Sequence, residues 1–206
     1  MTEQRPPTKR QLQAAETRER MLAAAATVFA REGYRTATVG AITDAANTAH
    51  GTFYLYFKNK DDALTQVLQA VTERVLVRPE VAPGAGRWER TEVMVRNYIG
   101  ALAANPGLYR ALLEGMLQSA TIEQVWLDMR ETFVNRIAAG IDRVVARGEM
   151  RALPDSQQAA RALVSMCEWH AFVALGLGHG TPSHEAVEEA IATVTELWSR
   201  ATWGAH

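Results

Sequence analysis

Apolar residues recur every three to four positions along most of this chain of 206 residues, and polar residues fill the positions between them. This spacing is typical of amphipathic α-helices, whereas the alternating patterns and hairpin turns that indicate strands are scarce. The sequence therefore predicts an all-α fold of about nine helices. We expect them at residues 14–31, 38–46, 50–57, 61–77, 88–104, 106–118, 121–147, 155–177 and 184–203.

The stretch from Thr38 to Lys60 predicts a helix, a tight turn and a second helix. Thr38 is a suitable N-cap, and Asn47 stands at the turn, where it tolerates a left-handed backbone. Phe53 and Phe57, four positions apart, can pack inward. The second helix then presents an outward face of small polar and aromatic side chains without a carboxylate, which suits entry into the major groove of DNA. Such units also occur as plain packing motifs, and this alternative stays open.

The segment GTFYLYFKNKDDAL, preceded by an Ala-rich helix, closely resembles the DNA-binding domain of the TetR family of bacterial repressors, and the match extends from about Arg18 to Leu68. The resemblance implies a helix–turn–helix DNA-binding domain at residues 14–60 and a ligand-binding and dimerisation domain at residues 61–206. The helix at 61–77 would link the two. Residues 1–13 are polar and basic, and we expect them to form a disordered arm.

The resemblance also implies which residues contact DNA. Tyr54, Tyr56 and Lys60 match positions that touch phosphates, and His50 and Thr52 are the expected readers of base edges. The full predicted set is Thr38, Val39, His50, Gly51, Thr52, Tyr54, Leu55, Tyr56 and Lys60.

The chain departs from the family pattern at three places. Asn47-Thr48-Ala49 replaces the usual Gly-Val-Ser turn, so a hydroxyl that could cap the second helix is missing. Gly40 replaces a longer side chain that helps many relatives to read bases. Thr43 replaces a small Ala and needs a hydrogen-bond partner. These departures bear on the contacts with DNA rather than on the fold.

Specific operators are normally bound by dimers whose recognition helices lie about 34–36 Å apart. The resemblance assigns dimerisation to the last two helices, which would form a four-helix bundle across a two-fold axis. The alternative is that the apolar faces of both helices belong to the core of a single chain. The predicted interface consists of Leu163, Ala174, Leu177, Val187, Ile191, Val194 and Trp198.

The resemblance further implies a cavity for a small, mainly apolar effector in the second domain. Methionine and aromatic side chains suit an adaptable apolar lining, although such stripes are more often plain core. Glu168 and His170 stand in an otherwise apolar helix, where burial is costly unless they are paired or face a ligand. The predicted lining is Met94, Tyr98, Tyr109, Met116, Trp126, Met129, Phe133, Cys167, Glu168 and His170.

The charge distribution agrees with contact to phosphates at one end only. Residues 1–60 carry nine Lys or Arg and five Asp or Glu, whereas residues 61–206 carry thirteen and eighteen. No run of 18 apolar residues is present, and the single cysteine is consistent with a reducing compartment. We therefore expect no membrane partner and a cytoplasmic location.

Two other classes of function stay open. Cys167 and His170 could form the thiolate–imidazole pair of a small enzyme, but no orienting group or oxyanion loop accompanies them. Cys167, His170, His179 and His184 could sense a metal or redox state, but their spacing matches no zinc pattern. We predict instead a homodimeric repressor that binds double-stranded operator DNA and a small-molecule effector, with no catalytic residue, no metal and no cofactor.

Overall fold

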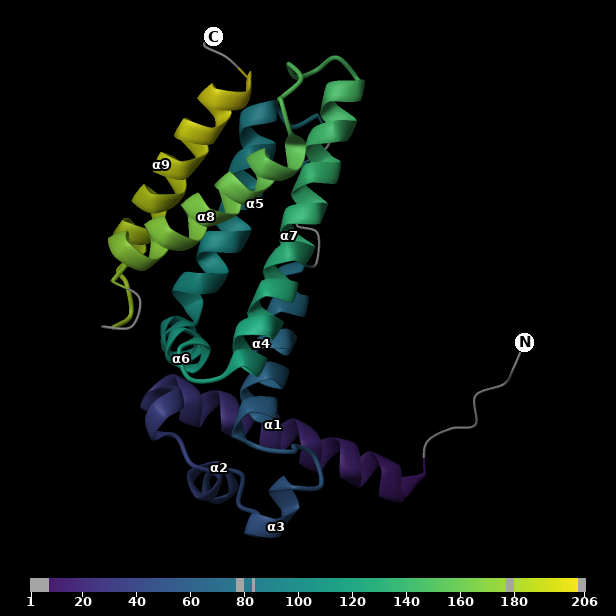
Figure 1. The fold of residues 1–206 in the computed structure, drawn as a ribbon, viewed down its shortest axis with the longest axis vertical. Coiled ribbons are helices and arrows are strands. Elements are labelled where there is room, and N and C mark those ends of the chain that lie inside the picture. Colours follow the sequence, from purple (N-terminus) through teal and green to yellow (C-terminus); the bar gives the residue numbers. More distant parts are fainter. Residues whose placement is uncertain (1–7, 77–79, 83, 177–179, 204–206) are drawn as a thin grey trace, which may run out of the picture.

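The computed structural model describes residues 8–76, 80–82, 84–176 and 180–203. This part of the chain forms nine α-helices and no strand, which confirms the predicted all-α class. In the elongated molecule, α1, α2 and α3 lie at one end, and α4 rises from them towards α5 to α9 (Figure 1). We call α1 to α3 the head and α5 to α9 the body. The helices are α1 (Lys9–Thr36), α2 (Val39–Ala45), α3 (His50–Phe53), α4 (Lys60–Leu76), α5 (Arg87–Ala104), α6 (Pro106–Met116), α7 (Ala120–Ala146), α8 (Ser156–Ala174) and α9 (His184–Trp203).

The first helix begins earlier than predicted, and residues 8–13 of the predicted disordered arm belong to this helix or its cap. The Thr8 hydroxyl accepts from the Gln11 amide at 3.3 Å, and the Gln11 side chain accepts from the Thr8 amide at 2.7 Å. This reciprocal capping satisfies two backbone N–H groups at the helix start. The prediction of disorder is therefore wrong for residues 8–13. Residues 1–7 of that arm lie outside the described residues. At its other end, α1 is interrupted at Gly33, whose φ is 77°.

The three helices of the head enclose a small core of large side chains. Phe29, Ile42 and Phe53 are fully buried, and the rings of Phe53 and Phe57 lie 5.1 Å apart. Burial of each such side chain contributes about 1.5–3 kcal/mol. The third helix ends at Phe53 rather than at Phe57, because the amides of Leu55 and Tyr56 bond to carbonyls only three residues back and so tighten the chain into a turn.

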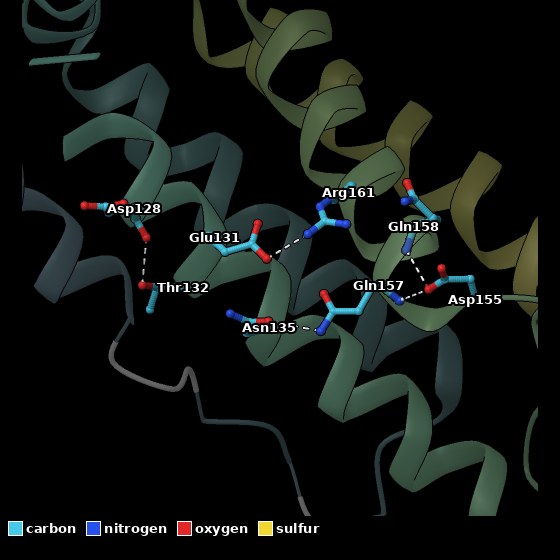
Figure 2. Close-up of polar contacts among 8 residues, drawn as sticks. All are labelled: Asp128, Glu131, Thr132, Asn135, Asp155, Gln157, Gln158 and Arg161. Carbon is cyan, nitrogen blue, oxygen red and sulfur yellow. Dashed lines mark hydrogen bonds and ion pairs between the residues drawn. The ribbon is translucent and has the colours of Figure 1, made fainter. Parts of the chain in front are cut away.

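The body is built from packed helix pairs, with α5 on α9 and α7 on α8. Polar contacts connect α7 to α8 (Figure 2). Glu131 pairs with Arg161 at 2.8 Å, and Asn135 accepts from Gln157 at 3.0 Å. Asp155 caps α8 by accepting the Gln157 amide at 2.8 Å. An exposed ion pair of this kind is worth at most about 1 kcal/mol. These contacts therefore fix how the two helices align more than they stabilise the fold.

The head and the body touch most extensively where α6 meets the end of α1. The Arg110 guanidinium donates to the backbone carbonyl of Arg31 at 3.0 Å. Gly107 lies so close to α1 that a Cβ atom there would stand 2.2 Å from the carbonyl oxygen of Ala30. One continuous core of buried residues extends from α1 through α4, α5 and α6 to α9. Packed side chains therefore connect the body to the head without a break.

The close approach of α6 to α1 can be tested at Gly107. Gly107→Ala is expected to destabilise the fold by about 1–3 kcal/mol, because the added methyl group collides with the backbone of α1. Gly100→Ala is the matched control, since Gly100 is also helical but has no atom within 4 Å of an added Cβ. That change should stabilise the fold by up to about 1 kcal/mol. Urea unfolding measures both, and equal stabilities would contradict the packing described here.

Candidate functional site

The turn between α2 and α3 has the geometry that the sequence predicts. The Thr38 hydroxyl caps α2 by accepting from the Ala41 amide at 3.1 Å. Asn47 adopts a left-handed backbone with a φ of 51°. Thr43 finds the partner that it needs, because its hydroxyl donates to a carbonyl one turn back at 3.1 Å. Ala49 precedes α3 without a side-chain cap, as its missing hydroxyl implies. The unusual turn sequence thus keeps the helix–turn–helix geometry.

The start of α3 and the turn after it lie on the outer side of the head, away from α9 (Figure 1). Tyr54 is 56% exposed and Leu55 is 78% exposed, and the His50 ring meets the Tyr54 ring with centres 5.8 Å apart. Nothing lies within 4 Å of a Cβ added at Gly51, so the backbone there is open to a close approach. This surface, which we call the outer face, carries no carboxylate. Of the predicted DNA contacts, Thr38, His50, Gly51, Tyr54 and Leu55 are exposed, whereas Val39, Thr52 and Tyr56 are half-buried.

Lys60 does not belong to the outer face. Its ammonium group donates to the carbonyls of Tyr34 at 2.9 Å and Ala37 at 3.2 Å, and lies 4.3 Å from the centre of the Tyr34 ring. Two of its three N–H donors therefore hold the end of α1 against α4, and its predicted contact with a phosphate stays a prediction that the third donor would have to serve. Lys58, two positions earlier, is exposed. The sequence shows both lysines but does not show which of them bonds to backbone carbonyls of the head.

Asp61 joins the head, α4 and the body. Its carboxylate accepts from the Tyr34 phenol at 2.6 Å and from the Ser119 hydroxyl at 2.6 Å. Ser119 also caps α7, so the start of that helix is tied to the same carboxylate. Burial, together with Asp61, raises the pKa of Tyr34 well above its usual range, and the phenol keeps its donor proton. We call Lys60 and Asp61, with the groups that they bind, the α4 clamp.

A cavity of about 100 Å³ lies in the body against the other part of α4. Most of its lining is apolar, as is usual for sites that bind small molecules. Leu68, Val71, Thr72 and Val75 of α4 form one wall. Of the predicted lining residues, Tyr98, Tyr109, Trp126, Met129, Phe133 and Glu168 border the cavity. The sequence analysis did not select the α4 wall or the remaining lining residues, which are Ala101, Leu102, Asn105, Leu108, Leu112 and Arg130.

One polar cluster interrupts the apolar lining. Arg130 Nε donates to Glu168 Oε2 at 3.0 Å, and the Tyr98 phenol donates to Glu168 Oε1 at 2.8 Å. Arg130 also bonds to the Ser165 hydroxyl, and its guanidinium lies 5.8 Å from the centre of the Trp126 ring. Burial and the charge of Glu168 raise the pKa of Tyr98, so this phenol stays a donor. The signal for Arg130 was indirect: a buried Glu168 requires a partner.

Four predicted lining residues lie elsewhere, which corrects their assignment. Met94 is 45% exposed on α5, Met116 packs against the core near the end of α6, and His170 is half-buried away from the cavity lining. Cys167 is buried, and this burial raises the pKa of its thiol to about 12. A thiol with that pKa stays protonated, which makes it a poor nucleophile and a poor metal ligand.

The described residues hold no group of three or more His, Cys, Asp or Glu that could bind a metal ion. His179, one of the residues considered for a metal site, lies outside the described part of the chain. Among the helices of that part, none is both long and apolar enough to cross a membrane.

Several predicted dimer-interface residues belong to the core of the single chain. Leu163, Ile191 and Val194 are 7%, 1% and 1% exposed, because these sides of α8 and α9 pack on α5 and on each other. A partner cannot contact them, so their assignment is corrected. Of the others, Val187 and Trp198 are half-buried, Ala174 is exposed, and Leu177 lies outside the described residues.

Other sides of α8 and α9 expose large apolar side chains that are not in the predicted interface. Trp169 is 62% and Val173 66% exposed on α8, and Leu197 is 55% exposed on α9. We call these three residues the exposed stripe. Inner and outer apolar residues both recur at helical spacing, so periodicity alone could not separate them. The exposed stripe leaves apolar surface that a second copy of the chain could cover.

Comparisons with known proteins agree with this arrangement. The family profile described as "Bacterial regulatory proteins, tetR family" matches residues 21–67, and "Transcriptional regulator EthR, C-terminal domain" matches residues 88–204. The chain is 27% identical over 157 residues to the HTH-type transcriptional repressor KstR of Rhodococcus jostii, covering 75% of this chain and 69% of that protein. It is 28% identical over 131 residues to the fatty acid metabolism regulator protein of Bacillus subtilis, covering 61% and 64%.

A solved structure shares the fold. The fatty acid degradation regulator FadR from Bacillus halodurans superposes with a TM-score of 0.71 at 20% identity, and the match covers 88% of this chain and 94% of that one.

The internal role of Lys60 predicts different effects for two neighbouring lysines. Lys60→Met is expected to lower the free energy of unfolding by about 1–3 kcal/mol, because two part-buried carbonyls lose a charged donor. Lys58→Met removes an equal charge from an exposed position and should change stability by less than about 0.5 kcal/mol. Chemical denaturation of both variants gives the comparison. Equal losses would show that Lys60 is not an internal anchor.

Proposed function

The chain belongs to the TetR family of bacterial transcriptional regulators, and from this premise we propose that it represses transcription as a homodimer on operator DNA and leaves the DNA when a small, mainly apolar effector binds. The observation that carries the proposal is the placement of α4. Its start is held to the head by the α4 clamp, through Lys60 and Asp61. Its later turns form a wall of the cavity, through Leu68, Val71 and Val75. One helix therefore connects the head, which carries the outer face, with the cavity.

DNA binding is assigned to the outer face of the head. His50 and Thr52 would contact base edges, and the apolar Leu55 would meet a thymine methyl group. Tyr54 and Lys58 would contact phosphates, which fix the position of the head but carry no sequence information. The absence of a carboxylate from the outer face supports this assignment, because like charges on DNA and protein would repel each other.

Dimerisation is assigned to α8 and α9, where the exposed stripe supplies apolar surface. A second copy covering Trp169, Val173 and Leu197 would bury three large side chains that the single chain leaves exposed. A four-helix arrangement around a two-fold axis would present two heads to one side of the DNA. Their recognition helices would then need a separation of about 34–36 Å to enter successive turns of the major groove.

The small size of the cavity explains how an effector would release the protein from DNA. Its volume of about 100 Å³ is below the roughly 300–1,000 Å³ of most small-molecule sites. A ligand of ordinary size must therefore move a wall, and the α4 wall is continuous with the clamp. The effector releases DNA only to the extent that it binds the displaced arrangement more tightly than the DNA-bound one.

The names of relatives support an apolar effector. One curated relative is named a fatty acid metabolism regulator, and one structural neighbour a fatty acid degradation regulator. We assign no catalytic activity to the chain, because its relatives are regulators and its single cysteine is held protonated. A repressor of chromosomal genes acts in the cytoplasm, and we place this one there.

Binding of the purified protein to its own upstream intergenic DNA tests the proposal. We expect a retarded band, a protected region with two-fold symmetry and a steep loss of affinity with salt. His50→Ala and Thr52→Ala should each cost about 1–3 kcal/mol on the operator and little on unrelated DNA. Lys58→Met should weaken binding to all sequences and lower the salt slope by about 1. Affinity no higher than for bulk DNA, at low salt too, would contradict the proposal.

A further inference from the structure

The charge balance of the cavity restricts the chemistry of its ligand. Arg130 and Glu168 are the charged residues of its lining, and their side chains are only 19% and 11% exposed. They pair at 3.0 Å, so their charges compensate each other. A pair held in mostly apolar surroundings is tolerated because it is balanced and hydrogen-bonded. A charged ligand group beside it would leave one of three charges without a partner.

The neutral polar groups of the cavity are mostly occupied by the protein itself. The Thr72 hydroxyl donates to the Met129 sulfur at 3.3 Å, and the Asn105 amide donates to the Ala101 carbonyl at 2.9 Å. The Tyr98 phenol donates to Glu168. These three donors therefore favour the protein's own acceptors over those of a ligand. Tyr109 and Trp126 also border the cavity and each has a polar hydrogen, but the ion pair is the polar group of the lining that offers both donors and acceptors at full charge.

The ion pair keeps hydrogen-bonding capacity beyond its own contact. A guanidinium has five N–H groups, and the contacts of Arg130 with Glu168 and Ser165 use two of its nitrogens. A carboxylate offers about four acceptor positions, and Glu168 accepts one bond on each oxygen. A ligand carbonyl or hydroxyl oxygen can accept from Arg130, and a hydroxyl can also donate to Glu168. Both bonds form without breaking the ion pair.

We infer that the effector is an uncharged, mainly hydrocarbon molecule with one hydroxyl or carbonyl group, which lies against the Arg130–Glu168 pair. Carboxylate ions and ammonium ions with the same hydrocarbon part bind more weakly, because each would compete with one partner for the other. The inference rests on the proposed function for the cavity being the effector site. It goes beyond that proposal in fixing the charge of the effector and the group that it presents.

Four probes with the same eight-carbon chain test the inference: 1-octanol, 2-octanone, octanoate and octylammonium. Calorimetric titration at pH 7.5 should show that the two neutral probes bind at least tenfold more tightly than the two ions. Glu168→Gln leaves Arg130 without its counter-charge, so octanoate should gain at least tenfold relative to 2-octanone. Arg130→Met leaves Glu168 unpaired, so octylammonium should gain in the same way. Gln157→Glu on the outer side of the α7–α8 pair is a control that adds charge away from the cavity.

Each outcome has a defined meaning. Tighter binding of octanoate than of 2-octanone by the unaltered protein, no binding of any probe, or an unchanged preference in a folded Glu168→Gln variant overturns the inference. Helical circular dichroism and the unfolding midpoint show whether each variant is folded, and the two substitutions of opposite charge provide independent tests. Operator retention is measured separately in a band-shift experiment with 2-octanone. Neutral probes that bind with the expected preference but leave operator affinity unchanged would support the inference and contradict the proposed function.

Discussion

Two neighbouring side chains at the start of α4, Lys60 and Asp61, bind this helix to the head, and Asp61 also binds the start of α7 in the body. Lys60 donates to two carbonyls at the end of α1, and Asp61 accepts from Tyr34 of α1 and from Ser119 before α7. These are contacts between charged groups and part-buried partners, which are stronger than neutral hydrogen bonds and costly to leave unmade. The position of the outer face relative to the body depends on them.

The same helix forms a wall of the cavity, so the geometry of the clamp and the occupancy of the cavity are not independent. A rigid helix that is anchored at its start and displaced along its length changes the direction in which the head points. The packing of α6 on α1 strengthens this dependence, because Leu108, Tyr109 and Leu112 of α6 border the cavity while Gly107 and Arg110 touch the end of α1. Under the proposed function, regulation by a small molecule would use these shared elements and need no separate relay.

Interactions between residues close in the sequence predicted the helices and turns well. The site residues that were missed depend on contacts between distant parts of the chain. The cap at Thr38 and the left-handed turn at Asn47 depend on residues nearby in the chain, so the sequence predicts them. Whether Lys58 or Lys60 faces solvent depends on where α1 ends. Periodicity shows that α8 and α9 have apolar faces but not which helix covers each one. Arg130 was missed because its place beside the cavity follows from its pairing with Glu168, 38 positions away.

The central claim, that filling the cavity repositions the heads through α4, is tested most directly by the distance between the two heads of a dimer. A nitroxide at Asp44→Cys, exposed on α2, in a Cys167→Ser background gives one spin label per chain. Val71→Trp places an indole in the cavity from α4 without a ligand. The cavity of about 100 Å³ is smaller than one of about 150 Å³ that binds benzene, so the larger indole must displace a wall. We expect the distance measured by pulsed electron paramagnetic resonance to shift by several Å. An unchanged distance in a folded Val71→Trp dimer would contradict it.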